Sequence, residues 1–225
     1  MERLIGQIQI QVNENIFIKD PNSSELGKRI IKEAIQLIDK IGLESFTFRK
    51  LAKELSTTES SVYRYFESKH KLLIYLTSWY WGWLEYKLVF STVNMASPEE
   101  QLRTSIQLMT ADISNKENLG HIDLEILNRI VISESSKAYL TKEVDDANKE
   151  GSYAGYKRLV GRISDMMLEI NPQFRNAHTL TSTIVEGILH QKYFADHLPS
   201  LTDIQHDPDQ LAAFYTDMSM AIITK

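Results

Sequence analysis

Residues whose side chains could do chemistry gather between positions 46 and 69. Three hydroxyls, at Thr58, Ser60 and Ser61, stand where a short helix would begin, and hydroxyls there favour phosphate oxygens. Arg49 adds a guanidinium, which fits both a phosphate group and the edge of a guanine base. These side chains indicate recognition of a nucleic acid, and they include no catalytic set.

Hydroxyl residues also predict where three helices begin in this stretch. Thr47 would N-cap a helix that ends near Leu55. Thr58 would cap a second helix, ending near Tyr65, and Ser68 would cap a third. The stretch is therefore expected to fold as three consecutive helices.

Apolar residues at helical spacing would close the first two helices around a small core. These residues are Leu51, Ala52 and Leu55 in the first helix and Val62 and Phe66 in the second. Only Ser56 and Thr57 separate the two helices, which is the connection of a helix-turn-helix. A short polar helix held by such a clamp suits insertion into the major groove of DNA.

The net charge of the 225-residue chain is −5, which does not by itself indicate a nucleic-acid binder. Residues 24–70 carry nine basic and seven acidic side chains, whereas residues 1–23 sum to −1 and residues 71–225 to −6. A locally basic surface is compatible with DNA binding because phosphates respond to nearby charge. So small a local excess is equally compatible with no function, and the charge decides little.

About 47 of the 225 residues, from Gly27 to Leu73, resemble the N-terminal domain of the TetR/AcrR family of transcriptional regulators. That family shows an apolar helix ending in glycine, an aromatic-Thr-x-Arg-x-Leu-Ala run, a polar turn, and a second helix with tyrosine and phenylalanine. The matching pieces here are Gly42, Phe46-Thr47-Phe48-Arg49-Lys50-Leu51-Ala52, Val62-Tyr63-Arg64-Tyr65-Phe66, and Ser68-Lys69 with Leu72-Leu73. The resemblance is dense and free of gaps.

The resemblance implies roles for individual side chains. Arg49 matches a position that contacts a base or a phosphate, and Lys69 matches a lysine that contacts phosphate. Tyr63 and Tyr65 match positions that contact the DNA backbone, although Tyr63 could instead be a half-buried packing residue or serve both uses. The DNA-binding residues predicted in this way are Arg49, Thr58, Glu59, Ser60, Ser61, Tyr63, Tyr65 and Lys69.

Two residues depart from the family's pattern. Phe48 replaces a small hydroxyl residue or valine, so this position would pack and not contact DNA. Glu59 stands where the family often has a basic or amide residue. A carboxylate repels phosphates but accepts a hydrogen bond from cytosine N4, so Glu59 argues against strong nonspecific affinity and not against the fold.

Several classes of protein are excluded or disfavoured by composition. The absence of cysteine excludes thiol catalysis, disulfides and cysteine-ligated zinc. No apolar run is long enough to cross a membrane and the N-terminus is no signal peptide, so we expect a cytoplasmic protein with no membrane partner. His190 and His197, seven residues apart, lack further ligands at fixed spacing, and no nucleotide-binding or hydrolase motif occurs. We therefore expect no metal, no cofactor and no enzyme activity.

The first 22 residues lie outside the family's pattern and are predicted to form an N-terminal arm. Polar and apolar residues alternate over positions 6–19 around Asn13-Glu14-Asn15, which indicates a short β-hairpin or an extended arm. Such an arm could reach DNA or a partner subunit, pack on its own domain, or be a partly disordered leader. An amphipathic helix is then expected from about Ser24 to Ile41, with Gly42 as its left-handed C-cap.

Helices are predicted throughout the rest of the chain. A connector helix from Ser68 to about Phe90 carries an aromatic cluster that would be core or pocket lining. Further helices are expected from Ser97, over 122–132, over 136–170, over 176–198 and over 208–224. The charged run 142–151 would be a solvated face of its helix or a break. The last two helices would form a dimer interface or pack on their own subunit.

Together these patterns predict an all-α chain with three parts: an arm at 1–22, a helix-turn-helix DNA-binding domain at 23–67, and a helical ligand-binding and dimerisation domain at 68–225. By resemblance we expect a homodimeric regulator, a repressor that binds a palindromic operator in double-stranded DNA and releases it when a small-molecule effector binds. The alternative is a helical sensor or protein-interaction module with a vestigial DNA-binding domain. An enzyme with an all-helical active site is a third, less favoured reading.

Overall fold

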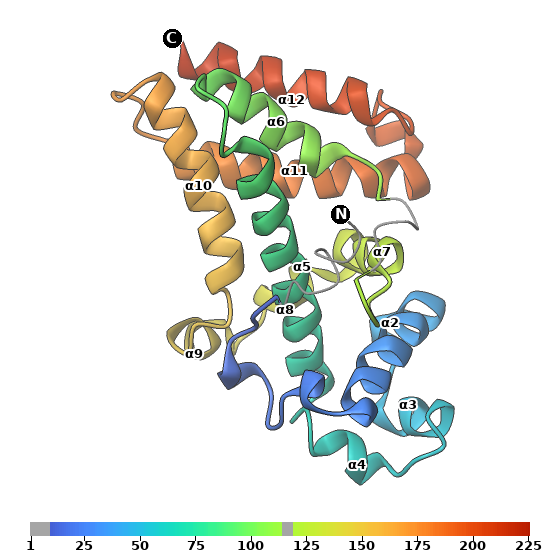
Figure 1. Ribbon diagram of the computed structural model, residues 1–225. Helices are drawn as coiled ribbons and strands as arrows, with labels where there is room; N and C mark the ends of the chain where they lie inside the picture. The colour runs from blue at the N-terminus through green and yellow to red at the C-terminus, as the bar shows by residue number, and fades with distance from the viewer. Residues whose placement is uncertain (1–9, 114–118) are drawn as a thin grey trace. The chain divides into compact units, whose positions relative to one another are not determined.

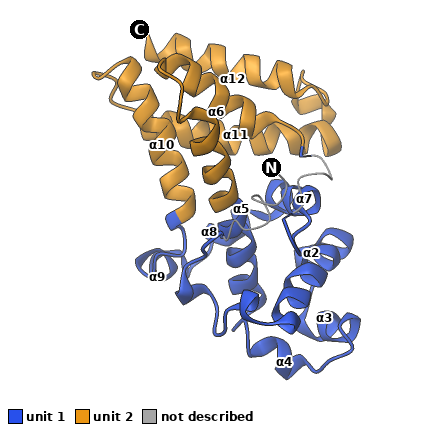
Figure 2. Ribbon diagram, viewed as in Figure 1, with its two compact units in different colours: residues 1–80, 113–154 blue, residues 81–112, 155–225 orange. Residues whose placement is uncertain are grey.

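The computed structural model describes residues 10–113 and 119–225, and over these residues it is built of helices, turns and coil (Figure 1). Within the described ranges the one β-type pairing is an isolated bridge between Leu119 and Ile122. The prediction of an all-α fold is therefore confirmed. The chain divides into two compact units, residues 1–80 with 113–154 and residues 81–112 with 155–225 (Figure 2).

Unit 1 contains the predicted helix-turn-helix. Its helices are α2 (Glu25–Ser45), α3 (Phe48–Glu54), α4 (Glu59–Tyr63), the first half of α5 (Lys69–Thr92), α7 (Leu124–Glu134), α8 (Ser136–Tyr139) and α9 (Val144–Lys149). The helix α2 packs against α3 and α7, and α3 packs against α4 (Figure 1).

The longest element of the DNA-binding segment, α2, begins and ends close to where the sequence predicts. Ser24 caps it, because its hydroxyl accepts a hydrogen bond from the backbone N–H of Gly27. Gly42 has the positive φ expected of a cap, at 73°, but its ψ of 156° lies outside the left-handed helical region. The chain therefore makes one more turn, to Ser45, before Phe46 leaves the helix.

The N-terminal segment is an arm and not a hairpin over its described part. Residues 6–9 of the predicted alternation lie outside the described residues, and residues 10–24 form coil and two short 3₁₀ turns, η1 (Glu14–Ile16) and η2 (Pro21–Ser23). The side chains of Asn13 and Asn15 both donate to the backbone carbonyl of Glu150. A strand would place these amides elsewhere, so the hairpin prediction is wrong for residues 10–19, where the arm packs on its own unit.

For the segment after α7 the sequence allowed either one long helix over 136–170 or a break at 142–151, and the structure has the break. Charged residues over 142–151 interrupt the helix, and α8 and α9 precede α10 (Ala154–Ile170).

Arg129 on α7 makes a bidentate ion pair with Asp39 on α2, with both N–O distances 2.9 Å. Glu134 accepts a hydrogen bond from the backbone N–H of Leu43. These contacts tie α7 to the C-terminal half of α2.

Unit 2 holds the second half of α5, α6 (Pro98–Thr110), α10 from residue 155, α11 (Ala177–His197), η4 (Pro199–Leu201) and α12 (Pro208–Ile223). The helix α6 packs against α12 and α11. Buried Glu85 of α5 receives Nε–H hydrogen bonds from Arg158 and Arg162, both at 2.9 Å. The helices α6, α11 and α12 match the predicted ones to within a few residues, whereas α10 forms only the second half of the segment predicted over 136–170.

The aromatic cluster of α5 divides between buried and exposed side chains. Trp79 and Trp83 are buried, which is the core reading of the sequence. Tyr86 and Phe90, farther along the same helix, stack on each other and are exposed, Phe90 by 74%. The end of α5 therefore presents apolar surface to solvent.

Candidate nucleic-acid interface

The buried side of the helix-turn-helix is the apolar clamp that the sequence predicts. Leu51, Leu55, Val62 and Phe66 are each at most 2% exposed. Burying such side chains stabilises the fold by about 1.5–3 kcal/mol each. The clamp fixes α3 and α4 to one another, so the polar side chains on their other side are held in a defined arrangement.

The turn between α3 and α4 is short because one residue adopts a left-handed conformation. Ser56 has a φ of 51°, and the next amide, Thr57 N–H, bonds back to the carbonyl of Ala52 at 2.9 Å. Thr47 caps α3, since its hydroxyl accepts from the amide of Lys50. Both features lie in the local sequence, which is why the helix-turn-helix could be predicted.

The hydroxyls at the start of α4 form a cluster instead of a side-chain cap. Thr58 is the N-cap residue, as predicted, but its Oγ1 shares hydrogen bonds of 2.9 Å with the hydroxyls of both Ser60 and Ser61. Thr58 and Ser60 are exposed. Two of the three hydroxyl hydrogens are used in these bonds, which leaves one that can donate to a phosphate oxygen.

Tyr63 lies on the outside of α4, where it is 46% exposed. Its ring packs edge-on against Phe48, with 5.0 Å between the ring centroids, and Phe48 itself is 4% exposed. Phe48 therefore packs, as its departure from the family pattern predicts. The hydroxyl of Tyr63 has no partner among the residues that the structure describes, so the side chain combines a packing ring with a free polar tip.

Tyr65 and Lys69 are placed differently from the other predicted DNA-binding residues. Tyr65 is 3% exposed, and its hydroxyl shares a 2.7 Å hydrogen bond with the hydroxyl of Ser24. The ammonium of Lys69 donates to the carbonyls of Leu43 and Glu44, at 3.0 and 3.3 Å, beyond Gly42 at the end of α2. Burial leaves Tyr65 no free face for a phosphate. Two hydrogen bonds to backbone carbonyls already use part of the donor capacity of the Lys69 ammonium.

Exposed cations surround the same surface. Arg49, Lys53 and Arg64 are exposed, and none has an ion-pair or hydrogen-bond partner within residues 10–113 and 119–225. Two of them, Lys53 and Arg64, are absent from the predicted set. Both lie opposite the buried apolar stripe of their helix, and this spacing in the sequence could have predicted them as exposed cations.

Acidic side chains share this surface with the cations. Glu54 and Glu67 are exposed and Glu59 is half-buried in the first turn of α4. Glu44, just beyond Gly42, has a lowered pKa because Lys137 donates a hydrogen bond to its carboxylate and attracts it electrostatically, with Lys69 adding a smaller attraction. The surface is thus of mixed charge, so specific contacts matter more than overall attraction.

Among the described residues, no group of three or more histidine, aspartate and glutamate side chains is arranged to hold a metal ion. Each of the described helices is also too short or too polar to cross a lipid bilayer.

Residues 30–76 match the family described as bacterial regulatory proteins, tetR family. A search of curated proteins finds no match.

Three solved structures share the fold over most of their length. A tetR-family regulatory protein from Rhodococcus RHA1 is 15% identical, with a TM-score of 0.60 over 89% of this chain and 97% of its own. AibR, solved with isovaleryl coenzyme A and operator DNA, is 16% identical, with a TM-score of 0.58 over 84% and 95%. The fatty acid degradation regulator FadR from Bacillus halodurans is 19% identical, with a TM-score of 0.57 over 85% and 96%.

The match covers the segment where a capped helix-turn-helix with an apolar clamp carries exposed hydroxyls and cations. The solved structures extend the likeness in fold to the remaining helices. The helix-turn-helix at residues 30–76 therefore matches the tetR family of bacterial regulatory proteins, and the likeness of the remaining helices to the solved structures is one of fold.

Proposed function

We propose that this chain is a ligand-responsive repressor that binds a palindromic operator in double-stranded DNA as a homodimer. The observation that supports it most is the outer side of α3 and α4, where Arg49, Tyr63 and the hydroxyl cluster of Thr58, Ser60 and Ser61 are held free by a buried apolar clamp. Hydroxyl, phenol and guanidinium groups are the donors that proteins use on phosphates and base edges.

Within this surface the proposed roles follow from exposure and bonding. Arg49 and Tyr63 contact DNA directly, and the hydroxyl cluster binds the phosphate backbone. Glu59 accepts a hydrogen bond from a cytosine amino group, which makes binding depend on the base sequence. Its negative charge also weakens the general attraction to phosphates. Tyr65 and Lys69 act mainly by holding α4 and the start of α5 in position, since both are bonded within unit 1.

The proposed domains are an arm at residues 1–22, a DNA-binding domain at 23–67 and a ligand-binding and dimerisation domain at 68–225. Phe214 and Ile222 lie on the same face of α12 and are exposed by 52% and 40%. Exposed apolar side chains in such a row favour an interface with a second subunit. In a dimer the two recognition helices would enter successive major grooves, about 34–36 Å apart.

The effector is proposed because the structural relatives include a regulator solved with both a small molecule and operator DNA. A molecule that binds the non-DNA conformation more tightly would release the operator. Its chemical identity is a separate question from the DNA-binding surface.

The test is selection of genomic DNA fragments by the purified protein, followed by sequencing, with Arg49→Ala in parallel. Lys149→Ala is the matched control, because Lys149 is also an exposed cation of unit 1 but lies on α9. We expect a pseudo-palindromic site that Lys149→Ala recovers and Arg49→Ala loses. Recovery of no site above background by the ligand-free protein would refute the proposal and favour the sensor or interaction module.

A further inference from the structure

The N-terminal arm reaches the end of α4, the proposed recognition helix. The backbone N–H of Ile18 donates to the carbonyl of Tyr65 at 2.8 Å, just past the last residue of α4. Ile16, two residues earlier in the arm, is 2% exposed and packs in the core of unit 1. Figure 1 shows this part of the arm beside α4. Residues 18 and 19 therefore lie at the edge of the helix-turn-helix surface.

The side chains at this point of the arm lie outside the core. Ile18 is 65% exposed, and Lys19 is exposed as well. The ammonium of Lys19 lies 5.3 Å from the centre of the Tyr65 ring, so a cation–π attraction holds it beside the end of α4. Its three N–H donors have no ion-pair or hydrogen-bond partner within residues 10–113 and 119–225. Lys19 is thus a positioned cation whose donors are unused.

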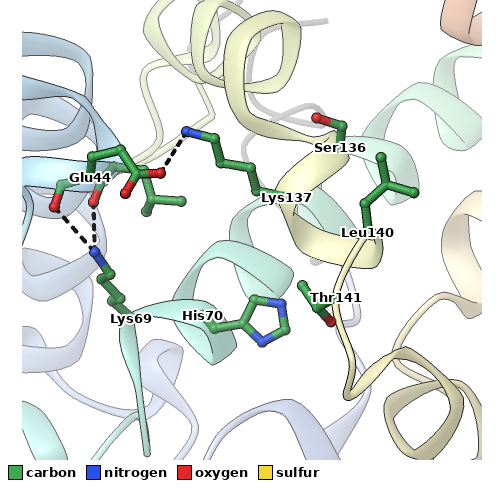
Figure 3. A pocket seen from close by; sticks show the side chains of 8 residues that line it. Glu44, Lys69, His70, Ser136, Lys137, Leu140 and Thr141 are labelled. Atoms are coloured by element: carbon green, nitrogen blue, oxygen red, sulfur yellow. Dashed lines mark hydrogen bonds and ion pairs between the residues drawn. The ribbon is translucent and has the colours of Figure 1, made fainter.

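Several other lysines of unit 1 are occupied. Figure 3 shows two of them, Lys69 and Lys137, with their ammonium groups already bonded. Lys71, which bonds to the arm, also pairs with Glu150 at 3.0 Å. Lys19 differs from these three because its ammonium contacts only a neutral ring among the described residues.

An unpaired ammonium at this place suits a DNA phosphate. A helix in the major groove has a phosphate backbone on either side, so groups beside its end lie near phosphates. Exposed Arg64 adds a second cation to this edge, while Asp20 and Glu67 are exposed acids that make no ion pair with Lys19 in the described structure. The four charges sum to zero, so the contact depends on where the Lys19 ammonium is held and not on attraction at a distance.

We propose that Lys19 binds an operator phosphate beside the recognition helix, so that the arm adds one backbone contact per subunit. This inference rests on the DNA-binding function proposed above, and it extends the interface to a segment outside the family match at residues 30–76. Tyr65 then acts on DNA through Lys19, because its ring holds the ammonium and its carbonyl holds the arm.

The first test measures operator affinity by fluorescence anisotropy for full-length parent protein and Lys19→Gln, from about 50 to about 200 mM salt. Each phosphate contact adds about 0.9 to the slope of log affinity against log salt. A homodimer loses two contacts in Lys19→Gln, so the deficit of this variant should shrink about tenfold over that range. Lys19→Arg should keep the parent's slope. Lys149→Gln is the matched control, since it removes an equal charge from an exposed position on α9 and should also keep the slope.

A second measurement locates the contact with operator fragments that carry single methylphosphonate linkages, which are uncharged. At one flanking linkage per half-site, neutralisation should weaken binding of the parent protein and leave Lys19→Gln unaffected. A salt slope of Lys19→Gln equal to that of the parent, or equal losses in both proteins at every linkage, would overturn the proposal. A lower urea midpoint with an unchanged slope would make Lys19 a purely structural residue. Absence of DNA binding by the parent protein would instead refute the proposed function, and this contact with it.

Discussion

Two tyrosines of one short segment should respond in opposite ways to loss of a single oxygen atom. Tyr63 and Tyr65 are two residues apart, yet one is 46% exposed and the other 3%. Replacing either by phenylalanine keeps the ring and removes only the hydroxyl. The pair therefore tests whether exposure separates a residue that contacts DNA from one that positions the helix.

The magnitudes follow from what each hydroxyl touches. In Tyr65→Phe the 2.7 Å hydrogen bond to Ser24 is lost, but Ser24 still accepts from the amide of Gly27, so no buried group is orphaned. The loss should lower the free energy of unfolding by about 1 kcal/mol. In Tyr63→Phe the contact with Phe48 remains and the free energy of unfolding should change by less than about 0.5 kcal/mol.

DNA binding should show the reverse pattern. A phosphate bond from the Tyr63 hydroxyl, worth about 1.5 kcal/mol, would be lost in Tyr63→Phe, which weakens affinity about tenfold. Tyr65→Phe should bind DNA within about twofold of the parent protein.

The assays are urea denaturation and fluorescence anisotropy with a selected operator fragment, at equal protein and salt concentrations. The reasoning is refuted if Tyr65→Phe weakens DNA binding as much as Tyr63→Phe while unfolding at the same urea concentration. An unchanged urea midpoint for Tyr65→Phe would contradict the positioning role even if no operator were known.

Three further changes have expected outcomes. Ser56→Gly should raise the free energy of unfolding by about 0.5–1 kcal/mol in urea, because Ser56 has a φ of 51°, where glycine is not strained; a lower value would refute this. Gly27→Ala should release the arm to proteolysis, because a Cβ atom there would clash with the backbone oxygen of Pro21; unchanged protection would contradict the packing. His121 has a lowered pKa, mainly through burial and then through Lys28, and its Nε2 atom lacks a partner among the described residues. The His121 imidazole therefore binds a proton more readily in the unfolded chain than in the folded one. The free energy of unfolding should be full above about pH 7 and fall as the pH drops through about 6.5. In urea titrations at several pH values, His121→Gln should reduce this fall.

Local sequence was enough to predict the elements whose causes are local. The predicted caps at Thr47 and Ser68 hold because a hydroxyl bonds an amide three residues later in the chain, whereas the hydroxyl of Thr58 bonds to neighbouring serines instead. Val62 and Phe66 are buried because their spacing places them on one helical face. The positive φ of Gly42 was predicted from its place just after the apolar stripe of α2. The additional helical turn to Ser45 was not predicted.

What sequence reasoning missed depends on partners far along the chain. The alternation at residues 10–19 reads as a strand, but Asn13 and Asn15 bond to the carbonyl of Glu150, which no local pattern announces. The burial of Tyr65 depends in the same way on Ser24. Such contacts join segments that are adjacent only after folding.

The division of the chain into units has a consequence for its synthesis. Unit 1 needs residues 113–154 as well as residues 1–80, and Tyr80 bonds to Asn128 at 2.8 Å. At ~5–20 residues per second, a ribosome takes roughly 4–15 s to make the intervening stretch 81–154. During that time the apolar side of α2 that α7 later covers stands open on the nascent chain. A fragment truncated at residue 80 would keep that side open permanently, so the recognition helices should be poorly suited to transplantation into chimeric proteins.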